Sequence, residues 1–542
     1  MTSSVAFVEI RDLNIHFPHA GDAGHVVRNV NLTIHAGKSV ALVGESGSGK
    51  SVTARSLIGL SGRGVKVSAS AFRLGGEDVL RFTERDWRRV RGQKVGFVLQ
   101  DALVSLDPLR RVHQLLSDAH GGKGNRESYI ESLRGVGVPH PDARLEQYSH
   151  ELSGGLRQRV LIATALARHP SLVIADEPTT ALDVTVQKQI LDLLAERRAA
   201  GHALLLISHD LAVVSKLADY VLVMKQGEVV EEGPTRDVLQ SPSHAYTRQL
   251  LDAIPSAQSR GFRLVRPAEV AGNDTINARI ALPPKRIEPD ISVLQAQNLS
   301  KHFHGSRTGP AVNGVSFQLA KGEALGIVGE SGSGKSTVAR LVLGLTEPDS
   351  GRVLLNGEPW SGIGEAARRP RRAGIQLIAQ DSLSSFDPRY DVERIIGESL
   401  DTVRIYGQAR RERVLEVLDS VRLSRSVLHR HPRELSGGQR QRVAIARAFA
   451  PRPHLLIADE PVSALDVSVQ AQVLDLLAEL QAESGTSLLF ISHDLGVVHH
   501  LTDKVVVMKD GQIVEDGDVT HVFSNPSHSY TRNLLAAIPS LA

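Results

Sequence analysis

The chain has 542 residues, 41% of them hydrophobic and 23% charged, a composition typical of a globular protein with several domains. A formal net charge of +3 is too small to indicate binding to nucleic acid or to an anionic membrane. The absence of cysteine excludes disulfides, iron–sulfur clusters, cysteine-ligated zinc and thiol catalysis. The first residues predict no secretory signal, and no apolar run reaches the roughly 20 residues of a membrane-spanning helix.

Apolar runs alternate with helical patterns along the chain. The runs at 39–44 and 171–176 are continuous, as in parallel strands buried on both faces, so the predicted class is α/β with a largely parallel sheet. Hairpins with tight turns are expected at Gln226-Gly227 and Asp510-Gly511. Two stretches rich in helix formers predict a helical subdomain in each half, at 101–152 and 381–435.

The sequence repeats itself at an interval of 283–285 residues. This interval is far longer than the 20–50 residues of a solenoid repeat and predicts two tandem copies of one domain. We expect these domains at 1–255 and 291–542, joined by a proline-containing linker at 256–290 in which residues 262–265 are a candidate packed segment. The repeated segments are GESGSGKS (44–51, 329–336), LSGG (152–155, 435–438), IADEP (174–178, 457–461), ISHDL (207–211, 491–495) and the tail PSHxYTR (242–248, 526–532).

GESGSGKS fits G-x-x-x-x-G-K-[ST] between a predicted strand and a predicted helix (52–60 and 337–345), the context of a phosphate-binding loop. Its glycines let backbone N–H groups close around phosphates, its lysine reaches the β- and γ-phosphates, and its last serine offers a hydroxyl to Mg²⁺. A glycine-rich turn without a ligand is the weaker alternative. The candidate nucleotide-binding residues are Gly44, Ser46, Gly47, Gly49, Lys50, Ser51, Val52, Gly329, Ser331, Gly332, Gly334, Lys335, Ser336 and Thr337.

Other polar residues follow predicted strands. LVIADEP and LLIADEP each end in two acids, which face opposite ways along a strand and so cannot share one role. Taken singly, such residues also have structural explanations, as solvated strand ends, satisfied histidines or core aromatics. The further candidates are two amides and two imidazoles after apolar runs, and an early aromatic in each copy that could stack on adenine: Gln100, Gln380, His209, His493, Phe17 and Phe303.

This ordered set resembles the ATPase domain of ABC transporters over nearly the whole of both copies. In that family the LSGG segment is the signature motif and serves the nucleotide of the facing domain. The resemblance implies that Ser153, Gly154 and Gly155 cap the ATP on Lys335, as the charge and geometry of a helix N-terminus suit. In the same way, residues of the second copy would cap the ATP on Lys50, namely Ser436, Gly437 and Gly438.

The resemblance also implies a role for each strand-end residue. Glu177 and Glu460 would polarise the attacking water, and His209 and His493 would sense the γ-phosphate. Mg²⁺ would be held by Ser51, Gln100, Asp176, Ser336, Gln380 and Asp459.

Two competent sites are expected because both copies keep these residues. Asp183 and Asp466, in the ALD segments, would lie across the seam between the copies. Leu156 stands where the second copy has Gln439, so the two sites need not be equal.

The tails at 241–255 and 525–539 resemble those of the paired ATPases of oligopeptide and dipeptide importers; their structural alternative is a packed helix with Tyr246 and Leu250 buried. The resemblance implies both ATPase subunits of a bacterial peptide importer in one chain, with ATP and Mg²⁺ as cofactors. It also implies two transmembrane permease subunits docked on 101–152 and 381–435, an extracytoplasmic solute-binding protein, no nucleic acid, and a peripheral location on the cytoplasmic face of the inner membrane.

Two other functions remain as alternatives, a fused sugar-importer ATPase and a soluble twin-ATPase translation factor acting on ribosomes. Zinc cysteines characterise the related DNA-repair ATPases, and their absence excludes that group. The basic runs 86–92 and 368–372 are expected to be a solvated helical face or loop, with a permease interface as the alternative.

Overall fold

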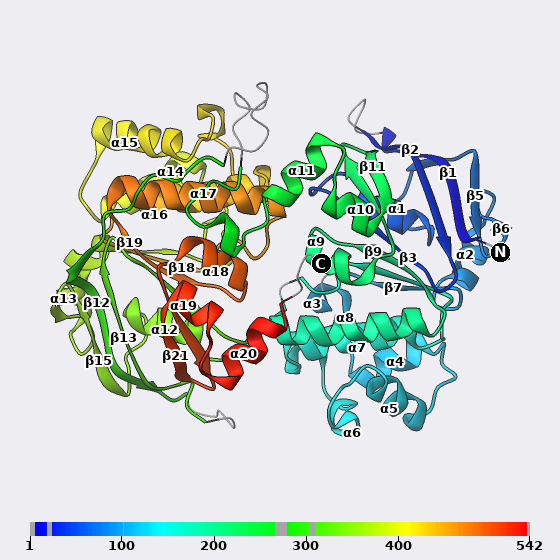
Figure 1. Ribbon diagram of the computed structural model, residues 1–542, viewed down its shortest axis with the longest axis horizontal. Helices are drawn as coiled ribbons and strands as arrows, with labels where there is room; N and C mark the ends of the chain where they lie inside the picture. The colour runs from blue at the N-terminus through cyan, green and yellow to red at the C-terminus, as the bar shows by residue number, and fades with distance from the viewer. Residues whose placement is uncertain are drawn as a thin grey trace. The chain divides into compact units, whose positions relative to one another are not determined.

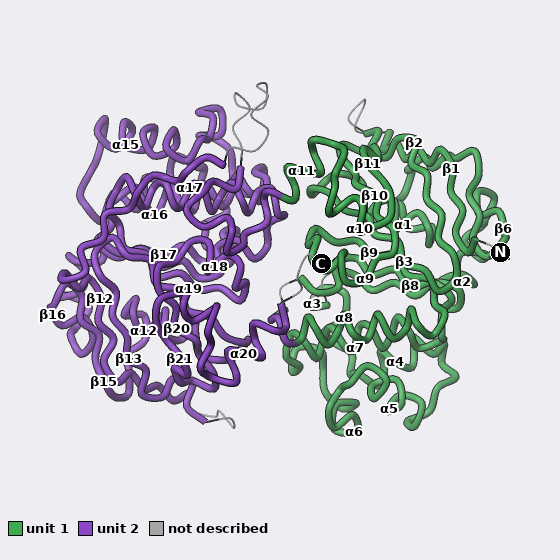
Figure 2. The backbone as a smooth tube through the Cα atoms, in the orientation of Figure 1, with its two compact units in different colours: residues 1–182, 186–251, 539–542 green, residues 183–185, 252–538 purple. Residues whose placement is uncertain are grey.

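The computed structural model describes residues 6–18, 24–100, 102–180, 182–265, 279–303 and 309–538. The chain divides into two compact units (Figure 2), of which unit 1 comprises 1–182, 186–251 and 539–542, and unit 2 comprises 183–185 and 252–538. Residues 266–278 of the expected linker lie outside the described ranges. Within those ranges, no helix is long and apolar enough to cross a bilayer.

A six-stranded sheet forms the centre of unit 1, with the order β11-β10-β3-β9-β8-β7 (Figure 1). Its strands pair in parallel except for β11, which folds back on β10 as a hairpin. Strands β3, β8 and β9 are buried at every position, as their unbroken apolar sequences require. The bounds are β3 Ser39–Val43, β7 Val95–Val98, β8 Leu172–Asp176, β9 Ala203–Ile207, β10 Tyr220–Lys225 and β11 Glu228–Pro234.

A smaller antiparallel sheet has the strand order β2-β1-β5-β6, and β4 also pairs with β1. This sheet shares a hydrophobic core with one face of the central sheet. It consists of β1 Ala6–His16, β2 His25–His35, β4 Lys66–Ser68, β5 Ala71–Leu74 and β6 Glu77–Asp78.

Helices of unit 1 connect the strands; in the expected helical stretch α3, α4 and α5 pack on α7, and α6 packs on α5 (Figure 1). They are α1 Lys50–Ser56, α2 Glu84–Val90, α3 Ala102–Ser105, α4 Val112–Ala119, α5 Arg126–Arg134, α6 Pro141–Arg144, α7 Gly154–Leu166, α8 Val184–Ala199, α9 Leu211–Leu217, α10 Thr235–Gln240 and α11 Ala245–Asp252.

Unit 2 repeats this plan, with a central sheet in the order β17-β18-β19-β14-β20-β21 and an antiparallel sheet in the order β13-β12-β15-β16. The strands are β12 Glu288–Lys301, β13 Val312–Lys321, β14 Ala324–Val328, β15 Ser350–Leu355, β16 Glu358–Pro359, β17 Ile375–Ile378, β18 Leu455–Asp459, β19 Ser487–Ile491, β20 Lys504–Lys509 and β21 Gln512–Asp518. The helices are α12 Lys335–Val342, α13 Glu365–Arg368, α14 Val392–Asp401, α15 Gly407–Ser420, α16 Gly437–Phe449, α17 Val467–Ser484, α18 Leu495–Leu501, α19 Val519–Ser524 and α20 Ser529–Ala536.

Both expected hairpins are present. Gln226 and Gly227 join β10 to β11 with φ of 50° and 88°, and Asp510 and Gly511 join β20 to β21 with φ of 48° and 79°. Two successive positive φ angles match the right-handed twist of the paired strands. The helices after the two phosphate-binding loops begin at Lys50 and Lys335, two residues earlier than expected.

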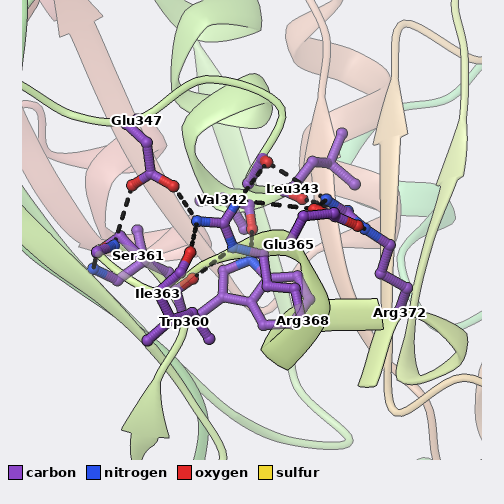
Figure 3. A network of polar contacts seen from close by, with 12 residues as sticks. Val342, Leu343, Glu347, Trp360, Ser361, Ile363, Glu365, Arg368 and Arg372 are labelled. Atoms are coloured by element: carbon purple, nitrogen blue, oxygen red, sulfur yellow. Dashed lines mark hydrogen bonds and ion pairs between the residues drawn. The ribbon is translucent and has the colours of Figure 1, made fainter. Parts of the chain in front are cut away.

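The basic run 368–372 holds the C-terminal end of α12, as Figure 3 shows. Arg368 is 5% exposed and donates to the carbonyl oxygens of Trp360, Gly344 and Ile363, besides pairing with Glu347. The Trp360 indole donates to Val342 O at 2.8 Å. A positive charge at a helix C-terminus interacts favourably with the exposed carbonyls. The expectation of a solvated face is therefore wrong for Arg368, because these carbonyls need its donors.

Unit 1 caps its equivalent helix with different residues. Trp87 lies so close to Gly59 that a Cβ there would approach its ring to 2.5 Å, and Arg91 donates to the carbonyls of Ile58 and Gly59 at 2.8 and 3.2 Å. Arg88 and Arg89 of the same run are exposed, as expected. In the run 86–92, Arg91 therefore caps the helix, whereas Arg88 and Arg89 face solvent.

The described part of 256–290 belongs to unit 2 and packs on α17 and α18. Asp475 of α17 accepts the backbone N–H groups of Leu264 and Val265, both at 2.9 Å. Ser259 hydrogen-bonds to His500 Nδ1 at 2.9 Å. Burial raises the pKa of Asp475 to about 6, although the two N–H groups favour its ionised form.

We expect Arg368→Ala to destabilise unit 2 by about 3 kcal/mol, because it leaves buried carbonyls without donors. Trp87 and Trp360 place one tryptophan in each unit, so urea unfolding followed by fluorescence in a Trp87→Phe background reports unit 2. The neighbouring Arg369→Ala, which alters an exposed side chain, is the control and should shift stability by less than about 0.5 kcal/mol. Equal effects of the two variants would contradict the capping role.

Asp475 should also give unit 2 a pH-dependent stability. Its pKa rises from 3.8 to about 6 on folding, so the folded state binds the proton more tightly and stability falls as pH rises through this range. The loss amounts to roughly 3 kcal/mol, at about 1.4 kcal/mol per pKa unit. Asp475→Asn should remove this slope in the fluorescence assay, whereas Asp192→Asn, at the half-exposed equivalent position of α8, should keep it.

Candidate functional site

The phosphate-binding loop follows β3 in unit 1 and β14 in unit 2, between the strand and the helix that the lysine begins. Gly44, Gly47 and Gly49 have φ of 142°, 81° and 100°, a left-handed backbone that glycine adopts without strain. Lys50 is buried, and its Nζ donates to the carbonyls of Gly44 and Glu45, both at 2.7 Å. Among the described residues no side chain caps α1 or α12, so their first N–H groups suit an anion.

The equivalent loop of unit 2 has the same geometry. Gly329, Gly332 and Gly334 have φ of 150°, 84° and 102°, and Lys335 Nζ donates to Gly329 O and Glu330 O, both at 2.8 Å. The remaining predicted loop residues lie in the loop or in the first turn of the helix: Ser46, Ser51, Val52, Ser331, Ser336 and Thr337.

A hydroxyl and a carboxylate meet beside each loop. Ser51 Oγ donates to Asp176 Oδ1 at 3.0 Å, and Ser336 Oγ to Asp459 Oδ1 at 3.4 Å. Asp176 is 1% exposed, its Oδ2 has no hydrogen-bond partner among the described residues, and burial raises its pKa. A buried, unpaired carboxylate oxygen beside a hydroxyl is a hard oxygen donor set and fits Mg²⁺.

The second acid of each pair meets the other strand-end residues. Gln100 Nε2 donates to Glu177 Oε2 at 2.7 Å, and His209 Nδ1 lies 3.1 Å from Glu177 Oε1. Burial opposes ionisation of Glu177, but the hydrogen bond and charge of His209 outweigh it and lower its pKa. The same contact raises the pKa of His209 against the effect of burial. The contact thus favours the charged form of both partners, an ionised carboxylate and a protonated imidazole.

Unit 2 assembles the same cluster at closely similar distances. Gln380 Nε2 donates to Glu460 Oε2 at 2.8 Å, and His493 Nδ1 lies 3.3 Å from Glu460 Oε1. His493 likewise lowers the pKa of Glu460 against burial. The structure therefore joins amide, acid and imidazole in both units.

Glu177 and Glu460 have φ of 50° and 47°, an uncommon left-handed conformation for a glutamate. Such a backbone persists where surrounding contacts hold it, and it is frequent at functional sites. The backbone N–H of Glu177 donates to Ile207 O at 2.9 Å, and the Thr180 hydroxyl donates to its side chain at 3.1 Å. Sequence reasoning did not single out Thr180.

The signature residues begin α7 and α16. Ser153 and Ser436 cap these helices by accepting the N–H groups of Leu156 and Gln439 at 3.4 and 3.2 Å. Gln439 also accepts the N–H of Ser436 at 3.0 Å, a reciprocal cap that Leu156 cannot make. This is the structural meaning of the one sequence difference between the motifs.

The two glycines of each signature motif have different surroundings. A Cβ on Gly155 would approach Val186 Cγ1 to 2.8 Å, and one on Gly438 would approach Val469 Cγ1 to 2.5 Å, so these positions need glycine for close packing of helices. Gly154 faces open space within the described residues, and Gly437 meets only ordinary contacts. The backbone of Gly154, which is also exposed, is therefore accessible.

The two candidate aromatics differ in exposure. Phe17 is partly buried against the core of unit 1, whereas Phe303 is 41% exposed. Within the described part of the chain, neither ring forms a hydrogen bond or ring pair with the strand-end cluster, and adenine stacking remains a prediction.

Sequence reasoning also missed the hydroxyls of Tyr246 and Tyr530, which reach the phosphate-binding loops. The recurrence of the tail motif at the same interval as the loops was the signal that could have indicated a shared role. A tail helix with Tyr246 and Leu250 buried, the structural alternative, is confirmed.

Comparisons with known proteins agree with this geometry. The family model described as ABC transporter matches residues 27–180 and 312–463. The model described as oligopeptide/dipeptide transporter, C-terminal region, matches 230–275 and 514–542.

Curated relatives align over almost the whole chain. It is 42% identical to the glutathione import ATP-binding protein GsiA of Salmonella paratyphi A, over 98% of this chain and 89% of that protein. It is 41% identical to the peptidoglycan transport ATP-binding protein YejF of Agrobacterium fabrum, over 99% and 97%. It is 39% identical to the oligopeptide transport ATP-binding protein OppD of Mycobacterium bovis, over 98% of each.

Among solved structures, a chain in the complex of archaeal ribosomal stalk protein aP1 with ribosome recycling factor aABCE1 matches with a TM-score of 0.62. The match covers 94% of this chain and 90% of that one at 21% identity, which shows a shared fold alone. The predicted fold class and family resemblance are confirmed by the family models and the curated relatives: the chain belongs to the ABC transporter family, as an ATP-binding protein that carries two ATPase domains in one polypeptide.

Proposed function

We propose that this chain powers the uptake of peptides or peptide-like solutes by hydrolysing ATP at two sites. The observation that carries the proposal is that each unit holds a complete set of lysine, hydroxyl–carboxylate pair and amide–glutamate–histidine cluster. The oligopeptide/dipeptide C-terminal region in both halves supports peptide-like cargo, as do the relatives that serve glutathione import and oligopeptide transport.

The surroundings of the site residues support a role for each of them in ATP binding or hydrolysis. Lys50 and Lys335, with the loop N–H groups, would hold the phosphates. The metal-ligand candidates Ser51, Gln100, Asp176, Ser336, Gln380 and Asp459 would hold Mg²⁺, which when bound neutralises phosphate charge.

The acid–imidazole pair would act on the attacking water. Glu177 is ionised and can accept a hydrogen bond from water, which orients the water and polarises it. His209 keeps this carboxylate ionised and in place. Gln100 fixes its other oxygen, and Gln380, Glu460 and His493 would do the same in unit 2.

We further propose a head-to-tail arrangement of the two domains. Ser153, Gly154 and Gly155 would complete the site of Lys335, with the reciprocal residues of α16 serving Lys50. Open space around Gly154 supports this, because its backbone is accessible to a nucleotide held elsewhere. Asp183 and Asp466 would lie at the seam between the two domains.

The proposed domain bounds are 1–255 and 291–542, with 256–290 as the connection. Two permease subunits would dock on 101–152 and 381–435, and a solute-binding protein would deliver the cargo outside the inner membrane. The exposed apolar side chains of Val104, Leu109 and Leu383 in these stretches support docking by another protein. A peripheral location on the cytoplasmic face would follow.

The two alternatives make different predictions about partners. A sugar-importer ATPase would also bind permeases but would not respond to peptides, and a translation factor would sediment with ribosomes. The curated relatives favour peptide import over both.

Glu177→Gln and Glu460→Gln should each lower turnover and trap ATP, because a neutral amide no longer polarises water while the loop still binds phosphates. The double variant should lose at least about 100-fold in kcat. Steady-state hydrolysis and retention of labelled ATP measure the two effects, with Glu228→Gln on the exposed edge of β11 as control. Wild-type hydrolysis in either single variant would contradict two competent sites.

The absence of native cysteine allows a direct test of the head-to-tail arrangement. In the Glu177→Gln, Glu460→Gln background, Ser153→Cys with Ser331→Cys should form a disulfide when ATP and Mg²⁺ are added, seen as a gel shift. Ser153→Cys with Ser46→Cys, within one domain, should not. The reverse pattern would refute the arrangement.

A further inference from the structure

In each unit the C-terminal tail ends on the phosphate-binding loop of the same unit. Tyr246 Oη accepts the backbone N–H of Glu45 at 3.1 Å, and Tyr530 Oη accepts that of Glu330 at 3.1 Å. Glu45 and Glu330 are the second residues of the two loops. Each contact joins residues about 200 positions apart in sequence, and it recurs independently in both units.

The tail motif PSHxY has the spacing that delivers this tyrosine. Glu231 on β11 accepts the N–H and Oγ–H of Ser243 at 2.6 and 2.7 Å and the N–H of His244 at 3.1 Å. His244 Nδ1 then accepts the N–H of Tyr246 at 3.1 Å and so begins α11. The serine and histidine anchor the tail, and the next turn places the tyrosine.

Unit 2 uses the same anchors. Glu515 accepts the N–H and Oγ–H of Ser527 at 2.6 and 2.7 Å and the N–H of His528 at 3.2 Å, and His528 Nδ1 accepts the N–H of Tyr530 at 3.1 Å. Although burial opposes ionisation of Glu515, hydrogen bonding by Thr531, Ser527 and His528 of the tail lowers its pKa to about 2. The anchor therefore stays charged at neutral pH.

The tyrosine rings are enclosed next to the loops. Tyr246 is 3% and Tyr530 7% exposed. Lys225 Nζ lies 4.6 Å above the Tyr246 ring, and Lys509 Nζ 5.1 Å above the Tyr530 ring, within cation–π range. Both lysines follow methionines whose carbonyls abut the first loop glycine, since a Cβ on Gly44 would come within 2.1 Å of Met224 O.

We propose that Tyr246 and Tyr530 are positioning residues for ATP, each holding its phosphate-binding loop in the conformation that receives the phosphates. Each hydroxyl fixes the second peptide N–H of a glycine-rich loop that would otherwise sample many conformations. A loop ordered in advance loses less entropy when the nucleotide binds, so the contact strengthens binding rather than the chemical step. With a pKa that burial raises to about 12, the Tyr530 hydroxyl is neutral at physiological pH.

The inference rests on the proposed assignment of ATP to the two loops. The test uses the full chain and compares Tyr246→Phe, Tyr530→Phe and the double variant, which keep the rings and remove only the hydroxyls. Tyr220→Phe on β10 and Tyr406→Phe in unit 2 alter exposed tyrosines and serve as matched controls.

The double variant should raise KM for ATP about five- to tenfold, as expected for one neutral hydrogen bond, with kcat changed by less than twofold. Amide hydrogen exchange of residues 44–50 and 329–335 should accelerate without nucleotide, while the melting temperature stays within about 2 °C of wild type. His244→Ala with His528→Ala should reproduce the rise in KM, because each imidazole holds the N–H that places the tyrosine.

Unchanged KM and unchanged exchange in the double Phe variant would overturn the inference. So would a fall in melting temperature with proportional loss of kcat, which would mean that the tyrosines only pack the tail. Lys50→Ala with Lys335→Ala distinguishes failure of this inference from failure of the proposed ATP sites. If that variant still binds ATP, the assignment of ATP to the loops is refuted. If it loses ATP binding and the Phe variants keep the wild-type KM, the tyrosine role alone is refuted.

Discussion

The site depends on one constraint of parallel sheets: strands that run the same way end at the same edge. In unit 1, strands β3, β7, β8 and β9 deliver the phosphate-binding loop, Gln100, the Asp176–Glu177 pair and His209 to that edge. Residues as far apart in sequence as Ser51 and Asp176, 125 positions, thereby come within hydrogen-bond distance. The strands can run in parallel only because their unbroken apolar sequences are buried on both faces, so the chemistry of the site is a consequence of the core.

The phosphate-binding loop is supported from several directions. Guanidinium groups cap the far end of its helix, through Arg368 in unit 2 and Arg91 in unit 1. The carbonyl at the end of β10 lies against its first glycine, and a tail tyrosine holds its second N–H. Arg91 and Arg368 stand shortly before the strands that lead to Gln100 and Gln380, so the same residues connect the loop helix to the strand that carries the amide. A loop rich in glycine needs such support because its own backbone imposes little order.

The two units use different residues outside the amide–glutamate–histidine cluster. Trp87 comes from α2 and Trp360 follows β16, yet each covers the glycine after its loop helix. Asp475 holds the segment 256–265, whereas the equivalent Asp192 pairs with Lys216. The amide–glutamate–histidine distances nevertheless agree within 0.2 Å. One difference near the proposed nucleotide, Leu156 against Gln439, removes a reciprocal helix cap from the first signature motif.

The sequence alone determined the duplication, the α/β class, the hairpins and the residues of the strand-end cluster. Periodicity and motif spacing are properties of the linear sequence, so they can be read from it without the fold. Only the tertiary structure decided which residues support them. The burial of Arg368 depends on carbonyls that come from the end of α12, and the pairing of Asp475 with Leu264 joins residues about 210 positions apart. The contact of Tyr246 with Glu45 likewise depends on how α11 returns to the sheet. A run of charges or a tail motif shows which interactions its side chains can make, but the fold determines which partners those side chains meet.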